Sequence, residues 1–83
     1  MNNLDWKVFK KNVADYVGVD VEEVTEETNL YEDLMMDSLG LFSLGIYLMN
    51  EYKLQMPIAS VATIETVKDI YEMMNEKGTV VNE

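Results

Sequence analysis

The chain has 83 residues, enough for one small domain, and 48% of them are apolar while 27% are charged, which is typical of a sequence that folds. Sixteen Asp and Glu against six Lys give a formal net charge of −10, which argues against nucleic acid or an anionic membrane as a partner and favours a basic protein surface or a cation. The lack of Cys and His excludes disulfides, zinc thiolate sites, thiol nucleophiles and a Ser-His-Asp triad.

The chain is predicted to be a single domain over residues 1–83, with its core at about 5–76. It has no run of about 18 apolar residues to span a bilayer, and its first residues lack the layout of a secretory signal. We therefore expect a cytoplasmic protein, poorly equipped to be an enzyme in its own right.

The first predicted element is an amphipathic helix. Apolar residues recur at spacings of three and four from Trp6 to Val17, which places them on one face. Three Lys residues fall largely on the other side. Asn3 or Asp5 is positioned to cap the start, and Gly18 to end the helix.

A long acidic connection is predicted from Val19 to Asp37, with eight acids and no base. The segment has no long helical period, so we expect one or two short turns, with aliphatic side chains fixing it to the helices. Those aliphatics are Val19, Val21, Val24, Leu30 and Leu34. An EF-hand register that starts at Asp20 fails, because Thr25 stands where the loop needs Gly and Tyr31 where it needs an acid.

A second helix is predicted from Ser38 to about Lys53, with Asp37 or Ser38 at its N-cap. At 100° per residue its apolar side chains form two adjacent stripes, one of Leu41, Leu44, Leu48 and Tyr52, the other of Phe42, Ile46 and Met49. Such a helix either lies at the centre of a bundle or presents an apolar strip to a partner. Two glycines inside it, Gly40 and Gly45, indicate either close approach by a neighbour or simple tolerance.

The last third of the chain predicts two more helices. Pro57 closes a turn before a short helix at 58–62. Thr66 and Asp69 have the spacing of a capping box, so a last helix runs to about Glu76 and ends at Gly78, with a frayed tail to residue 83. The fold class is therefore all-α, a bundle of three main helices and one short one.

Seven Met residues raise the question of an adaptable binding surface. We assign Met56, Met73 and Met74 to the core or to helix ends. For Met35, Met36 and Met49, around the second helix, an interface and ordinary packing remain open alternatives.

The most specific local feature is Asp37-Ser38-Leu39, although an ordinary Ser cap explains it when it is taken alone. The longer segment Leu30-Tyr-Glu-Asp-Leu34-Met-Met-Asp37-Ser38-Leu39 resembles the Asp-Ser-Leu signature of acyl carrier proteins, with its Leu-x-x-Asp-Leu lead-in. Residues 19–30, 51–58 and 66–70 are similar to further segments of that family, in the same order. The resemblance covers roughly residues 5–76.

The resemblance implies a four-helix bundle with a long loop between the first two helices. It implies that Ser38, flanked by Asp37 and Leu39, is the attachment point of 4′-phosphopantetheine. A separate phosphopantetheinyl transferase would supply the group from coenzyme A with Mg²⁺, because no His or Lys adjoins the hydroxyl. The positive end of the helix macrodipole tolerates the added phosphodiester. The protein would then be a non-catalytic, monomeric carrier of acyl thioesters.

Further roles follow from the resemblance. Acidic residues before Ser38 would steer basic partner enzymes, together with apolar side chains on the outer face of the second helix. The implied partner-binding residues are Glu32, Asp33, Met36, Phe42, Ile46 and Met49, with Asp37 adding charge. An acyl-chain pocket would be formed by Leu41, Leu44, Leu48, Ile64 and Ile70.

The sequence departs from fatty-acid carriers at one point. Where those usually place acids along the second helix, this chain has Gly40, Ser43, Met49 and Asn50, and only Glu51 remains. We therefore expect a specialised carrier in fatty acid, lipid or polyketide-type biosynthesis, in which apolar contacts outweigh carboxylates in partner binding. A peptidyl or aminoacyl carrier, or an acidic helical adaptor without a prosthetic group, are the alternatives.

Overall fold

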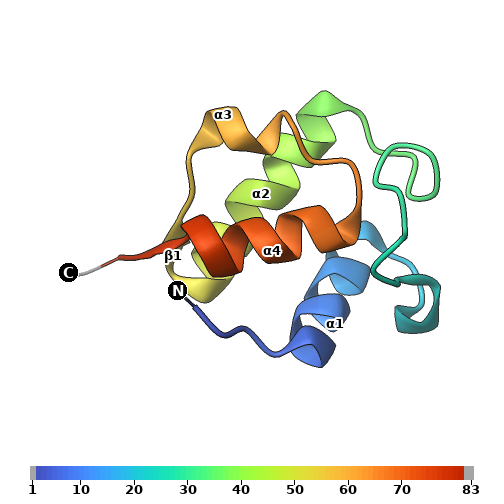
Figure 1. Ribbon diagram of the computed structural model, residues 1–83. Helices are drawn as coiled ribbons and strands as arrows, with labels where there is room; N and C mark the ends of the chain where they lie inside the picture. The colour runs from blue at the N-terminus through green and yellow to red at the C-terminus, as the bar shows by residue number, and fades with distance from the viewer. Residues whose placement is uncertain (1, 82–83) are drawn as a thin grey trace.

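A computed structural model describes residues 2–81, and the predicted all-α bundle is confirmed (Figure 1). The elements, in chain order, are α1 (Trp6–Val17), a 3-10 turn η1 (Val21–Glu23), α2 (Ser38–Tyr52), β1 (Leu54–Gln55), α3 (Ile58–Val61), α4 (Val67–Lys77) and β2 (Thr79–Val80). Three helices are long and α3 is a single turn. No helix within residues 2–81 is long and apolar enough to cross a membrane.

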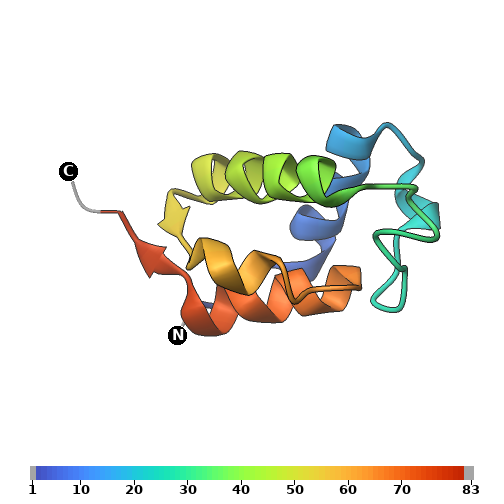
Figure 2. The same ribbon diagram turned by 90° about the horizontal axis from the view of Figure 1, so that it is seen from above.

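Helix α2 lies along the long direction of the molecule, between the α1–α2 connection and the small sheet (Figure 2). The connection between α1 and α2 lies at one end, where α2 begins. At the other end α2 is followed by β1, and the C-terminal tail leaves the molecule there. The two ends of α2 therefore face different surroundings, an acidic loop at its start and a small sheet at its finish.

The ends of the helices are set by local hydrogen bonds. Of the two candidates for the first cap it is Asp5 whose carboxylate accepts the Lys7 N–H, at 2.8 Å. Gly18 ends α1 in the left-handed conformation, with φ 88°, which glycine adopts without steric cost. The predicted capping box of α4 is present, because Thr66 and Asp69 each accept the other's backbone N–H.

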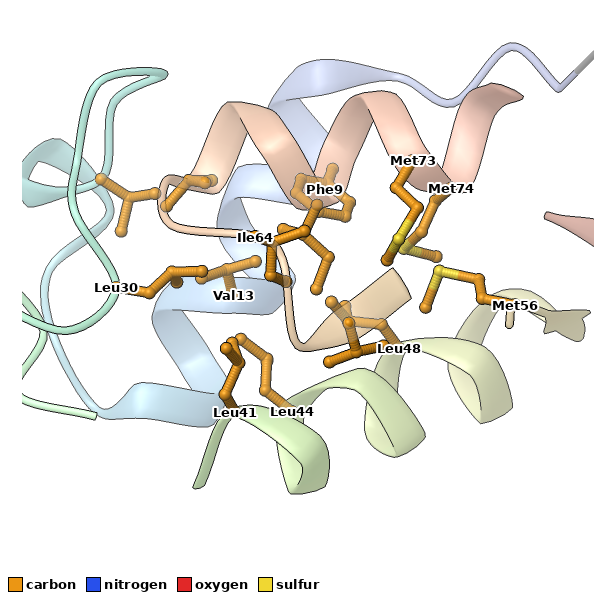
Figure 3. Packing of buried hydrophobic residues seen from close by; sticks show 14 of the residues in the cluster. Phe9, Val13, Leu30, Leu41, Leu44, Leu48, Met56, Ile64, Met73 and Met74 are labelled. Atoms are coloured by element: carbon orange, nitrogen blue, oxygen red, sulfur yellow. The ribbon is translucent and has the colours of Figure 1, made fainter. Parts of the chain in front are cut away.

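The core is one cluster of buried side chains to which every helix and the long connection contribute (Figure 3). Phe9 and Val13 enter it from α1, Leu44 from α2 and Met74 from α4, and each has an exposed fraction of 0%. The predicted burial of Met56, Met73 and Met74 is confirmed. Burial of about 25 cal/mol per Å² of apolar surface is the main term that stabilises this small domain.

The long connection is a structural part of the fold. Val24 and Leu30 are fully buried, as expected of side chains that fix the segment, whereas Val21 is exposed. The Leu30 N–H donates to the Glu65 carbonyl at 2.8 Å, and the Val67 N–H donates to the carbonyl of Thr28 at 3.0 Å. The connection thus supplies the acceptor for a backbone N–H at the start of α4. Within α4 itself that N–H has no acceptor.

The expected fraying of the tail is wrong for its first residues. Thr79–Val80 pairs antiparallel with Leu54–Gln55, and the Val81 N–H donates to the Lys53 carbonyl at 3.0 Å. The physical reason is that α4 delivers the tail beside the extended segment after α2, where unpaired backbone groups are available. Residues 82 and 83 lie outside the described part of the chain.

Candidate functional site

Ser38 is the first residue of α2, and its side chain is exposed. The cap of the helix is Asp37, whose Oδ1 accepts the Gly40 N–H at 2.7 Å, while its carbonyl accepts the Leu41 N–H at 2.9 Å. Within residues 2–81 the Ser38 hydroxyl has no hydrogen-bond partner. The simple alternative, a serine that serves as the N-cap, is therefore wrong, and the hydroxyl is free at the positive end of a helix.

Apolar residues occur on both sides of Ser38 in the sequence. Met35 is 84% exposed and Leu39 is 77% exposed, whereas Met36 packs partly against the core. Met35 has φ 57°, the left-handed region that is uncommon for a residue with a Cβ, so the chain turns sharply just before the helix. Exposed apolar side chains on both sides of a free hydroxyl form a surface that a partner protein can cover.

Gly40 lies close to this turn. A Cβ at that position would stand 3.2 Å from Asp37 Oδ1 and 3.7 Å from the Met36 terminal methyl group. The glycine therefore lets the capping carboxylate lie against the first turn of α2, whereas Met36 would make an ordinary contact with a Cβ. Of the two explanations for a glycine here, close approach is the one that the geometry supports.

The acids expected to steer partners differ in what they do in the fold. Asp33 accepts the Asn29 N–H at 2.8 Å in the connection, and Asp37 caps α2 through the Gly40 N–H, so the two carboxylates hold the backbone on either side of Ser38. Glu32 is exposed and accepts no hydrogen bond within the described residues. No group of three acidic side chains there is arranged to hold a metal ion. Glu32 is therefore the acid of these three whose charge can be changed without disturbing the loop.

The outer stripe of α2 faces solvent only in part. Ile46 is 50% exposed, whereas Phe42 and Met49 are half-buried and pack against the core. The Met49 sulfur also accepts the Met56 N–H at 3.3 Å. Of the three open Met alternatives, Met35 is therefore exposed, while Met36 and Met49 combine packing with partial exposure. No charged residue occurs from Ser38 to Asn50, so this face of α2 is uncharged.

The five residues expected to form an acyl-chain pocket are all part of the packed core. Their exposed fractions are at most 4%, and they are Leu41, Leu44, Leu48, Ile64 and Ile70. At Gly45 a Cβ would stand 3.7 Å from the Val61 methyl groups of α3, an ordinary van der Waals contact, so simple tolerance explains this glycine. Room for an acyl chain among these side chains requires them to separate, at the cost of their contacts.

The sequence matches the family model described as phosphopantetheine attachment site over residues 7–74. The chain belongs to the acyl carrier protein family. It is 32% identical over 74 residues to polyketide-8 synthase acyl carrier protein 2 of Streptomyces avermitilis, a match that covers 89% of this chain and 85% of that one. It is 36% identical over 62 residues to an acyl carrier protein of Syntrophobacter fumaroxidans, with 75% and 76% covered. Members of this family are non-catalytic carriers with a covalent phosphopantetheine group.

One surface feature of this carrier was not predicted from the sequence. An open hollow lies at the far end of α2, between the helix, Lys53, β1 and Val81. The uncharged stretch of α2 is a sequence signal for that face of the helix. The contribution of Val81 follows from the pairing of the tail, which no local pattern predicted.

Proposed function

We propose that this acyl carrier protein bears its 4′-phosphopantetheine on Ser38 and presents acyl thioesters to the enzymes of a polyketide-type pathway in the cytoplasm. One observation supports Ser38 as the attachment residue. The Ser38 hydroxyl is exposed and free of hydrogen bonds within residues 2–81, while Asp37 does the capping. The similarity to a polyketide synthase carrier supports a polyketide-type cargo over an aminoacyl one.

The residues around Ser38 fit the group chemically. Attachment forms a bond from Ser38 Oγ to the phosphorus on the pantetheine side of the coenzyme A diphosphate. The bond from that phosphorus to the bridging oxygen breaks, adenosine 3′,5′-bisphosphate leaves, and the serine proton passes to the transferase. No basic residue of this chain lies near Ser38 in the sequence, so the transferase must supply the base and the Mg²⁺ that stabilises the departing phosphate. The N-terminus of α2 then favours the phosphodiester charge. When bound, the group supplies the thiol that holds the acyl chain.

Intact mass tests the attachment site. The protein is incubated with coenzyme A, Mg²⁺ and a broad-specificity phosphopantetheinyl transferase, and we expect one added phosphopantetheinyl unit. Ser38→Ala should add none, and Ser43→Ala, at an exposed serine five residues further along the same helix, should be modified like the parent protein. Modification of Ser38→Ala, or none in the parent protein, would refute the assignment.

We also propose that apolar contacts on α2 contribute more to partner affinity than the carboxylates do. Ile46 and Met49 present apolar surface beside an uncharged helix face, and Asp33 and Asp37 are engaged in holding the loop. The test compares kcat/KM of the transferase for Met49→Ala and for Glu32→Lys. We expect the larger loss for Met49→Ala. A large loss for Glu32→Lys with Met49→Ala unchanged would show that charge dominates.

A further inference from the structure

The hollow at the end of α2 has a volume of about 650 Å³ and walls of two kinds. Ile46, Met49 and Val81 give it apolar surface. Lys53, together with Asn50 and Gln55, brings hydrogen-bond donors to the same space. None of those three side chains donates a hydrogen bond to any group within residues 2–81, so they are free to bind a ligand.

Hydrogen bonds fix the walls of this hollow. Lys53 ends α2 in the left-handed conformation, with φ 54° and ψ 46°, and its N–H donates to the Met49 carbonyl. The Lys53 carbonyl accepts the Val81 N–H, which fixes the tail as one wall. Met49 is held by the hydrogen bond from the Met56 N–H to its sulfur. Hydrogen bonds therefore fix Lys53, Val81 and Met49, which line the hollow, and the hollow opens to solvent.

The hollow lies on the same side of α2 as Ser38. At 100° per residue, Ser38, Phe42 and Met49 fall within about 40° around the helix axis, so they form one line along its surface. The rise of 1.5 Å per residue separates Ser38 from Met49 by about 16 Å. A phosphopantetheine arm has roughly thirteen bonds between phosphorus and sulfur, and an extended chain of that length spans about 15 Å. An acyl group on an arm attached at Ser38 therefore reaches the hollow.

We propose that this hollow holds the acyl end of the protein's own phosphopantetheine arm when the acyl group carries an oxygen beyond its thioester, as a 3-oxoacyl group does. The inference rests on the proposed attachment to Ser38. The apolar walls cover the carbon chain, and the free amide and ammonium donors bind the ketone oxygen. Because the arm is covalently attached, the effective concentration of the acyl group at the hollow is on the order of millimolar. The acyl group therefore occupies the hollow even if it binds there weakly.

The core offers such a group a poorer place. Leu44, Leu48 and Ile64 have exposed fractions of at most 4%, so an acyl chain enters only if these side chains separate. A ketone oxygen among them would lose its hydrogen bonds with water and find no donor side chain in return. A 3-oxoacyl group therefore favours the hollow. Because Ile46 and Met49 also belong to the proposed partner face, an enzyme that docks there displaces the acyl group and receives it.

Two acyl groups of equal carbon number test the proposal. The transferase loads the protein from acetoacetyl-coenzyme A or from butyryl-coenzyme A, which differ by a single ketone, and intact mass verifies each product. Amide chemical shifts in ¹H–¹⁵N spectra are then compared. We expect the acetoacetyl form to shift Asn50, Gln55 and Val81 relative to the butyryl form. Lys53→Met should reduce those shifts by half or more, whereas Lys7→Met on α1, with the same change of charge, should leave them unchanged.

The outcomes separate the two proposals. Shifts centred on Leu44, Leu48 and Ile64 would place the acyl group in the core and overturn the hollow as its seat. Identical spectra for the two acyl forms, or shifts confined to the start of α2, would show an arm that extends into solvent and would overturn it equally. A failure of loading, seen in the mass, would instead refute attachment to Ser38.

Discussion

The Leu30 side chain provides the sharpest test of the fold, because it lies in the long connection and yet is fully buried. Leu30→Ala removes three carbons, a loss of about 2.4 kcal/mol of transfer free energy at 0.8 kcal/mol for each. The cavity that remains raises the cost to about 3 kcal/mol or more. The backbone hydrogen bonds of residue 30 to Glu65 and Met36 stay possible, so the effect isolates the packing of one side chain.

Urea unfolding followed by circular dichroism measures this loss. A chain of this size has a slope of about 1 kcal/mol per molar urea, so the midpoint should fall by about 3 M. Leu30→Val removes one carbon and should cost about 1 kcal/mol, which stays measurable if Leu30→Ala does not fold. Val21→Ala, at an exposed position of the same connection, should change stability by less than about 0.5 kcal/mol. Equal effects of Leu30→Ala and Val21→Ala would refute the view that the connection is part of the core.

Further predictions concern charge and pH. Burial opposes ionisation of Asp69, but hydrogen bonds from the Glu65 and Thr66 N–H groups outweigh it and hold its pKa below 3.8. This stabilisation is present above about pH 4 and is lost as the pH falls further. Asp69→Asn should therefore make the free energy of unfolding fall less steeply with decreasing pH. Burial raises the pKa of Tyr52 above 10.0 despite the hydrogen bond from Asn12, so stability falls as pH rises beyond 10. Tyr52→Phe should flatten that alkaline loss, at a cost of about 1 kcal/mol at pH 7. Added salt should raise the melting temperature, since it screens a net charge of −10.

The helices could be predicted because local signals specify them. Asp5 begins α1 and the Thr66 capping box begins α4 through side-chain-to-backbone hydrogen bonds that span a few residues, and Gly18 ends α1 through its left-handed backbone. The sequence could predict that Ser38 lies at the start of a helix. It could not predict that the Ser38 hydroxyl is free of hydrogen bonds, because Asp37 and Ser38 are both good N-caps. Geometry alone shows which of the two accepts the Gly40 N–H.

The tail and the hollow could not be predicted from the sequence. A pair of two-residue strands carries almost no periodicity, and its partners, Leu54–Gln55 and Thr79–Val80, are separated by two helices. The position of Val81 beside Lys53 follows only from the packing of α4 against the rest of the bundle. Sites that combine a helix end with a distant tail therefore emerge at the tertiary level, even in a chain this short.

Charge and apolar surface are separated between the connection and α2, and we expect them to play different parts in the binding of a partner enzyme. The acids of the connection stand at the Ser38 end, whereas residues 38–50 carry no charge. Coulomb attraction between exposed charges acts over about a Debye length, 8 Å at physiological salt, so we expect the acids to raise the rate of encounter with a basic partner enzyme. Leu39 and Ile46 are exposed by 77% and 50%, and because their burial would act only on contact, we expect it to set how long the complex lasts. Salt should then slow association with a partner enzyme while leaving its dissociation rate nearly unchanged.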